Sequence, residues 1–128
     1  MNVDGTGVTR LTNNPASDEG SRSGWSPNGK QIVFSSRRDG GDLDLFVMNA
    51  DGSGVTQLTF NDGIADDDPV WSPDGTHIAF HSARDGDEEI FVVNADGSGA
   101  TQLTHNTALP DGTPIFDAVP AWRARPLR

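Results

Sequence analysis

Cysteine is absent from the 128 residues, so the chain can form neither a disulfide framework nor a thiolate metal site. Apolar residues never run on for the roughly 18 positions that a membrane-spanning helix needs, which excludes helical membrane insertion. The first residues show neither a basic n-region nor an apolar h-region, so no signal peptide is visible in this sequence. The lack of cysteine is itself compatible with any compartment.

Positive charge is also scarce. Nine Lys and Arg face 19 Asp and Glu, which gives a formal net charge of −10. A surface of this sign repels phosphate backbones, so capture of nucleic acid by charge is excluded as a function class. The same charge suits solubility, cations or basic protein partners.

Long helices are not favoured by the composition. Only 34% of the residues are hydrophobic, whereas 15 glycines and 8 prolines interrupt the chain. This balance is typical of many short strands joined by tight turns, and it predicts an all-β fold.

Two phrases repeat along the chain. MNADGSGVTQLT, from Met48, returns as VNADGSGATQLT from Val93 and also opens the chain as MNVDGTGVTRLT. WSPNGKQIVFSS starts at Trp25, returns as WSPDGTHIAFHS at Trp71, and persists in a reduced form as AWRARP around Trp122. The three tryptophans are 46 and 51 residues apart, and a period of about 45 without helical spacing indicates a four-stranded propeller blade. Their fixed place in the repeat predicts that they pack between blades.

Each repeat can be divided into four strands and tight turns. In the second repeat the expected strands are 69–72, 77–82, 89–94 and 100–104, joined by the turns SPDG and NADGSG and by a longer loop. The third strand, IFVV at 90–93, is apolar on consecutive positions, as is LFVM at 45–48. Continuous apolarity predicts that both faces of each sheet are covered, as in stacked blades.

The second repeat resembles a WD-repeat-like blade of the TolB-type β-propeller family. The residues that carry the likeness are Trp71-Ser-Pro-Asp-Gly, Arg84-Asp-Gly, Ile90-Phe-Val-Val-Asn94, Asp96-Gly and Leu103-Thr. The resemblance implies an incomplete, open propeller of about two and a half blades made of antiparallel strands. Its parts are the last strand of a preceding blade at 1–12, a blade at 22–59, a blade at 69–104, and the closing first strand of the next blade at 118–123.

The first phrase opens at Met1 on what is elsewhere the middle of a repeat, which favours the C-terminal part of a longer propeller. A short protein that closes by self-association is the alternative. In either case the exposed first and last strands predict self-association through their edges.

Catalytic and metal motifs are missing. No Ser has Gly at both −2 and +2, no phosphate-binding G-x-x-x-x-G-K-[ST] loop occurs, and no stretch fits the EF-hand pattern. His77 and His81 lie about 13 Å apart on one strand, too far to share a zinc ion. We therefore expect no catalytic residue, no metal and no cofactor, although a cation held jointly by 66–68 remains an alternative.

The loops at one end of the propeller differ between the repeats and carry most of the charge, whereas the SPDG and NADGSG turns at the other end are nearly invariant. Variable loops on a rigid scaffold are the usual place for binding. The sequence thus predicts a recognition surface there, with a merely solvated rim as the alternative. Its candidate residues are Arg38, Asp66, Asp67, Asp68, Arg84 and Asp117.

These expectations describe a non-catalytic interaction scaffold that binds a protein or a small ligand. The resemblance implies a bacterial protein of the periplasm, the cell envelope or the exterior, and protein docking as with the peptidoglycan-associated lipoprotein partner of that family. No residue specifies that partner. The alternative implied by the same blade is the gating propeller of a hydrolase such as a prolyl-oligopeptidase-like peptidase.

Overall fold

The computed structural model describes residues 3–15, 18–60, 63–84, 86–105, 110 and 122, with only the backbone of 18–23. The described residues contain no helix, and therefore none long and apolar enough to cross a membrane. They form eight strands, which are β1 (Asp18–Trp25), β2 (Gln31–Ser36), β3 (Asp44–Asn49), β4 (Thr56–Gln57), β5 (Asp66–Trp71), β6 (His77–Ser82), β7 (Glu89–Asn94) and β8 (Thr101–Gln102).

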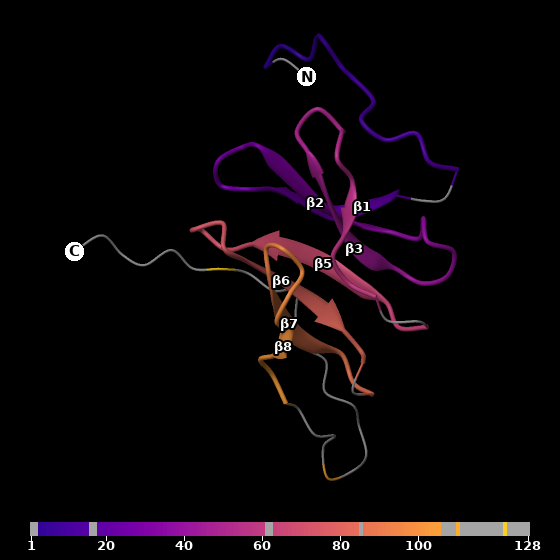
Figure 1. Cartoon of the computed structure of the whole chain (residues 1–128), viewed down its shortest axis with the longest axis vertical. Helices are drawn as coiled ribbons and strands as arrows, with labels where there is room; N and C mark the ends of the chain where they lie inside the picture. The colour runs from indigo at the N-terminus through magenta and orange to yellow at the C-terminus, as the bar shows by residue number, and fades with distance from the viewer. Residues whose placement is uncertain are drawn as a thin grey trace, which may run out of the picture.

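Each repeat folds into one antiparallel sheet whose strands pair in sequence order. The first sheet is β1-β2-β3-β4 and the second is β5-β6-β7-β8. Figure 1 shows the first sheet, in purple and magenta, lying across the second, in orange tones, with the N-terminal segment along the far side of the first. The predicted all-β fold of four-stranded propeller sheets is confirmed.

The predicted strand positions agree best in the middle of each sheet. β6 and β7 coincide with the expected strands at 77–82 and 89–94. β5 begins at Asp66 rather than at residue 69, because a bulge between Asp67 and Val70 carries the strand past Pro69. A proline lacks the amide hydrogen that a regular ladder needs, and a bulge is one of the few places where a strand tolerates it.

Tight turns close the end of each sheet opposite the long loops. Gly75 of the SPDG turn has a φ of 72°, a left-handed conformation that glycine adopts at no steric cost. Asp74 accepts hydrogen bonds from the Ser72 hydroxyl (2.6 Å) and from the Thr76 hydroxyl and amide, which lower the pKa of its carboxyl to about 2. The amide of Ala95 donates to the Thr76 carbonyl (2.9 Å), so the two turns of the second sheet lie at one end, as predicted.

Side chains help the backbone to hold the short fourth strands. Thr59 donates to Asp44 (3.0 Å) and accepts from the Leu45 amide (3.0 Å). Thr104 of the second repeat likewise donates to Glu89 and accepts from the amide of residue 90. A buried acid at the start of the third strand thus fixes the threonine that follows the fourth, which explains why Gln-Leu-Thr recurs although β4 and β8 have two residues each.

The main core lies between the two sheets. One apolar cluster joins Val33, Leu45, Val47, Leu58, Trp71, Ile78, Phe80, Phe91 and Val93. Among the described strands of the second sheet, β5 is the one whose backbone approaches the first sheet. It approaches β1 most closely, so the two sheets converge at their first strands. β3 is buried from Asp44 to Met48, which confirms the prediction that both of its faces are covered. In β7 every second residue is only half-buried, a departure from that prediction, because one face of the second sheet lacks a neighbouring sheet among the described residues.

The far side of the first sheet carries a second, smaller cluster. It consists of Ile32, Phe34, Phe46 and Met48, against which Leu11 packs. The described residues 3–12 form no strand, and their assignment to a preceding blade remains a prediction. Leu11 nevertheless sits on the first sheet as Leu58 sits on the second: a Cβ on Gly52 would lie 2.6 Å from the Leu11 carbonyl oxygen, and one on Gly97 would lie 3.1 Å from that of Leu58.

Gly97→Ala tests this close approach between sheets. Gly97 has a φ of 87°, and an added methyl group would press on the Leu58 backbone. We expect the free energy of unfolding to fall by roughly 1–2 kcal/mol for the left-handed conformation, and further for the contact. Gly63→Ala is the matched control, because its φ is 80° but an added Cβ meets nothing within 4 Å. Equal losses for the two variants in urea unfolding would show that the contact contributes nothing.

Asp44→Asn tests the buried acid. Asp44 is 2% exposed, and burial raises the pKa of its carboxyl to about 7, with further upward contributions from Asp39 and Asp42. A pKa higher in the folded than in the unfolded chain contributes stability that is greatest below about pH 4 and is lost as the pH rises through about 7. Denaturant unfolding over this pH range should therefore show a weaker decline of stability in Asp44→Asn than in the wild type.

The control for this pH series is Asp96→Asn. Asp96 is exposed, and its hydrogen bonds from Ser98 lower the pKa of its carboxyl, so it titrates below the window of interest. An unchanged slope in Asp44→Asn, or an equal change in both variants, would contradict the assignment.

Candidate binding site at the loop end of the second sheet

The long loops of the two sheets meet at one end of the molecule. The segment that leads into the second sheet is fastened beneath the 37–43 loop of the first: the Asp66 amide donates to the Leu43 carbonyl (2.7 Å), and the Ile64 amide donates to the Asp42 carboxylate (2.8 Å). The sequence correctly placed these loops together and opposite the tight turns.

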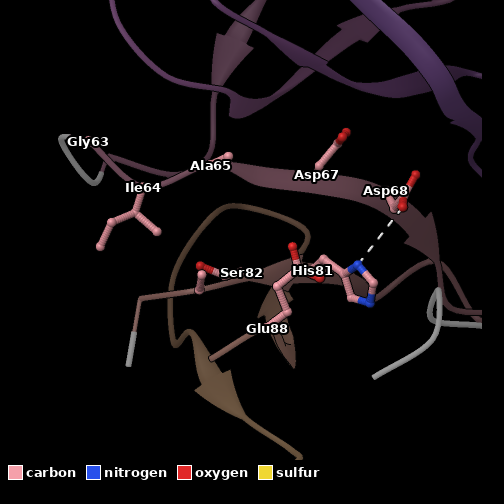
Figure 2. A pocket seen from close by; sticks show the side chains of 9 residues that line it. Gly63, Ile64, Ala65, Asp67, Asp68, His81, Ser82 and Glu88 are labelled. Carbon is pink, nitrogen blue, oxygen red and sulfur yellow. Dashed lines mark ion pairs between the residues drawn. The ribbon is translucent and has the colours of Figure 1, made fainter. Parts of the chain in front are cut away.

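A pocket of about 570 Å³ opens at this end of the second sheet (Figure 2). One wall comes from the loop that enters β5 and from β5 itself, and the other from the end of β6 and the loop that follows. The residues that line it are Gly63, Ile64, Ala65, Asp67, Asp68, His81, Ser82, Ala83 and Glu88. Three carboxylates and one imidazole therefore share the pocket.

The two aspartates of the pocket point in different directions. Asp67 faces the first sheet, where it accepts a hydrogen bond from the Ser35 hydroxyl (2.7 Å). Asp68 lies in the bulge with a φ of 52°, and its carboxylate is 3.9 Å from the His81 imidazole nitrogen, as the dashed line in Figure 2 marks. The side chains of Asp68 and His81 are 20% and 16% exposed, so a ligand in the pocket could reach both.

Asp66 does not belong to the exposed surface that the sequence predicts. It lies in β5 rather than in a loop, it is fully buried, and it pairs with the Arg84 guanidinium at 2.7 Å. Arg84 also donates to the Ser82 hydroxyl (3.0 Å) and covers the rings of Phe80 and Phe91, whose centroids are 5.3 Å and 4.7 Å away. A buried carboxylate needs such a partner, and a guanidinium over aromatic rings can supply it.

Arg38 repeats this arrangement in the first sheet. It covers Phe34 and Phe46, with centroids at 5.0 Å and 5.2 Å, and donates to the Ser36 hydroxyl (3.1 Å). It borders a smaller cavity of about 320 Å³ beside Leu11, away from the pocket of the second sheet. Asp117 lies outside the described residues. Of the predicted residues that the structure describes, Asp67 and Asp68 line the pocket, whereas Asp66 and Arg84 form a buried ion pair with each other.

His81 and Glu88 join the site although the sequence did not single them out as binding residues. Asp67 pairs with His81 across the antiparallel ladder, and the bulge then turns Asp68 toward the same imidazole. The alternation of strand residues was visible in the sequence, but the register of β5 on β6 depends on that bulge.

The arrangement suits binding of positive charge. The alternative of a cation held jointly by 66–68 is not supported, since Asp66 pairs with Arg84 and, among the described residues, no three His, Cys, Asp or Glu side chains are grouped so that they could hold one metal ion. Ser82 is 1% exposed and its hydroxyl accepts a hydrogen bond from Arg84. Because His81 and Ser82 are consecutive in β6, their side chains leave the strand on opposite faces, unlike a nucleophile paired with its base. Asp68 and Glu88 place carboxylates in this cavity, and carboxylates are the usual hydrogen-bond acceptors for ammonium and guanidinium groups.

Comparison with known proteins agrees with this architecture. Residues 22–116 match the family model of the TolB beta propeller domain. The Tol-Pal system protein TolB of Alcanivorax borkumensis is 36% identical over 62 residues, which are 48% of this chain and 14% of that protein. The crystal structure of TolB from Acinetobacter baumannii is 25% identical and superposes with a TM-score of 0.64 over 79% of this chain and 24% of that one.

A likeness to a hydrolase concerns the fold alone. The crystal structure of a puromycin hydrolase mutant is 24% identical, with a TM-score of 0.56 over 72% of this chain and 15% of that one. The chain spans a quarter or less of the length of each of these three relatives.

Because the family match includes β2 to β8 and most of the chain, this chain belongs to the TolB beta propeller domain family.

Proposed function

We propose that the chain is a non-catalytic interaction module that docks a protein partner at its loop end, in the periplasm or elsewhere in the cell envelope. The observation that carries the proposal is the acidic pocket between β5 and β6, lined by Asp67, Asp68 and Glu88. The partner segment that fits it carries a lysine or arginine side chain.

Three features support this function. The net charge of −10 attracts basic partners over distance, and the pocket concentrates that charge at one place. The buried carboxylate of Asp66 pairs with Arg84 and thereby ties β5 to the loop after β6, the two elements that form the walls of the pocket. The chain also belongs to the TolB beta propeller domain family, and one of its relatives is the Tol-Pal system protein TolB.

The alternative, a gating propeller of a hydrolase, has less support. It rests on a structural likeness of 24% identity, which shows the fold alone.

The proposal can be tested with a short arginine-containing peptide as a probe. In a titration of the ¹⁵N-labelled chain followed by NMR, the amide shifts should concentrate at 63–65, at 67–68 and around His81. Asp68→Asn and Glu88→Gln should each weaken binding by about threefold to tenfold, because a partly exposed charge pair contributes on the order of 1 kcal/mol. Added salt should weaken binding as well.

The matched control is Asp96→Asn, which removes one negative charge at the turn end of the same sheet. It should leave the affinity nearly unchanged. If Asp96→Asn weakened the peptide as much as Asp68→Asn, or if the shifts gathered at the turn end, docking at the pocket would be refuted.

A further inference from the structure

Three consecutive aspartates of β5 have counterparts of three different kinds. The buried carboxylate of Asp66 pairs at 2.7 Å with a guanidinium, which is a permanent cation. Asp67 accepts a hydrogen bond from a serine hydroxyl of the first sheet, which is an uncharged donor. Asp68 faces the imidazole of His81, and the charge of an imidazole changes within the range from about pH 5 to about pH 8. Asp68 is therefore the aspartate whose neighbouring charge depends on pH.

The contact between Asp68 and His81 is longer than a hydrogen bond. The carboxylate Oδ2 and the imidazole Nδ1 are 3.9 Å apart, beyond the roughly 3.2 Å at which such groups share a hydrogen. While the imidazole is neutral, this contact adds no charge pair, and the carboxylate can accept a cation from a ligand. Once the imidazole is protonated, the two groups attract each other. Both side chains are mostly buried, so water and salt screen this attraction less than at an open surface.

The charged groups that face His81 come from two neighbouring elements. Among the described residues, β5 contributes Asp67 and Asp68, and the loop before β7 contributes Glu88, which enters the same pocket (Figure 2). β7 places the uncharged Ile90 opposite His81. The described lining of the pocket contains neither lysine nor arginine. A proton on His81 is therefore the positive charge that this lining can acquire.

We propose that His81 is an internal competitor for the basic side chain that docks in the pocket, so that protonation of His81 releases the partner. The inference rests on the proposed function and names the regulation of the same site. An imidazolium beside Asp68 compensates the charge of that carboxylate and repels an incoming ammonium or guanidinium group. Docking and protonation therefore oppose each other, and by linkage each weakens the other by the same factor.

The other two histidines of the chain lie outside the pocket. His77 is on the same strand, but at the end beside the tight turn, where its Nδ1 is 2.7 Å from the Thr76 hydroxyl. His105 follows β8 and does not line the pocket. The pH dependence of docking should therefore belong to one imidazole, and His77 offers a matched control for it.

The affinity of a peptide measured at two pH values tests the proposal. The probe is a short arginine-containing peptide with blocked ends and no other titratable side chain, so its charge stays constant. For the wild type the affinity should fall about threefold to tenfold from about pH 8 to about pH 5.5, as expected for a partly exposed charge pair. The lower limit keeps ordinary carboxyl groups ionised. In His81→Gln the ratio of the two affinities should be close to one.

Two control variants should keep the fall in affinity of the wild type. His77→Gln removes an imidazole from the other end of β6. Asp44→Asn removes a carboxyl group of the first sheet whose pKa is raised by burial to about 7, so that it titrates in the same range. A fall that persists in His81→Gln, or that disappears in Asp44→Asn, would overturn the role of His81.

Calorimetry supplies a second measurement that needs no change at His81. The Asp44→Asn variant is titrated with the same peptide at about pH 6.5 in two buffers of different ionisation enthalpy. Docking should release a fraction of a proton for each peptide bound, because it disfavours the imidazolium. Uptake of protons, or no exchange of protons, would overturn the inference.

The outcomes separate this inference from the proposed function. Equal affinity of the wild type at both pH values would overturn the competition by His81 and leave docking at the pocket intact. Absence of binding at every pH would overturn both.

Discussion

The structure depends on the burial of one sheet face against another. The first sheet contributes apolar residues to two clusters, one on each of its faces, and a four-stranded meander alone covers neither face. The cluster that joins Leu45 and Leu58 to Trp71 and Phe80 is where this requirement is met. β3, whose two faces are both covered, is buried from Asp44 to Met48, while β7 on the outer side of the second sheet alternates between buried and half-buried residues.

Polar side chains make this stacking specific. Asp44 and Glu89 accept hydrogen bonds from Thr59 and Thr104, the threonines that follow the short fourth strands. The pair of Arg84 and Asp66 ties the loop after β6 to the entering strand β5 beside the pocket. Charged groups thus serve two purposes here: buried ones shape the end of the sheet, and exposed ones give that end its negative potential.

Much of the fold could be predicted because repetition makes the hydrophobic pattern easy to read. β6, β7 and the positive φ of Gly75 follow from local residue types and spacing. The start of β5 did not follow, because Pro69 suggests a strand beginning where the chain in fact bulges. Asp66 was misplaced because three consecutive aspartates are typical of a solvated loop, and their sequence does not show that the Arg84 guanidinium, from the loop after β6, pairs with one of them.

The sequence by itself determined the all-β class, the four-stranded unit, the turns and the acidic character, since these rest on composition and on contacts between near neighbours. Tertiary structure alone decided which of the charged residues reach solvent and which are enclosed. It also decided that equivalent residues differ in exposure, as Trp25 and Trp71 do. The physical reason is that the burial of a side chain depends on what packs against its face of the sheet. The residues of similar repeats are nearly the same whether or not another sheet packs there, so the sequence of a repeat does not reveal it.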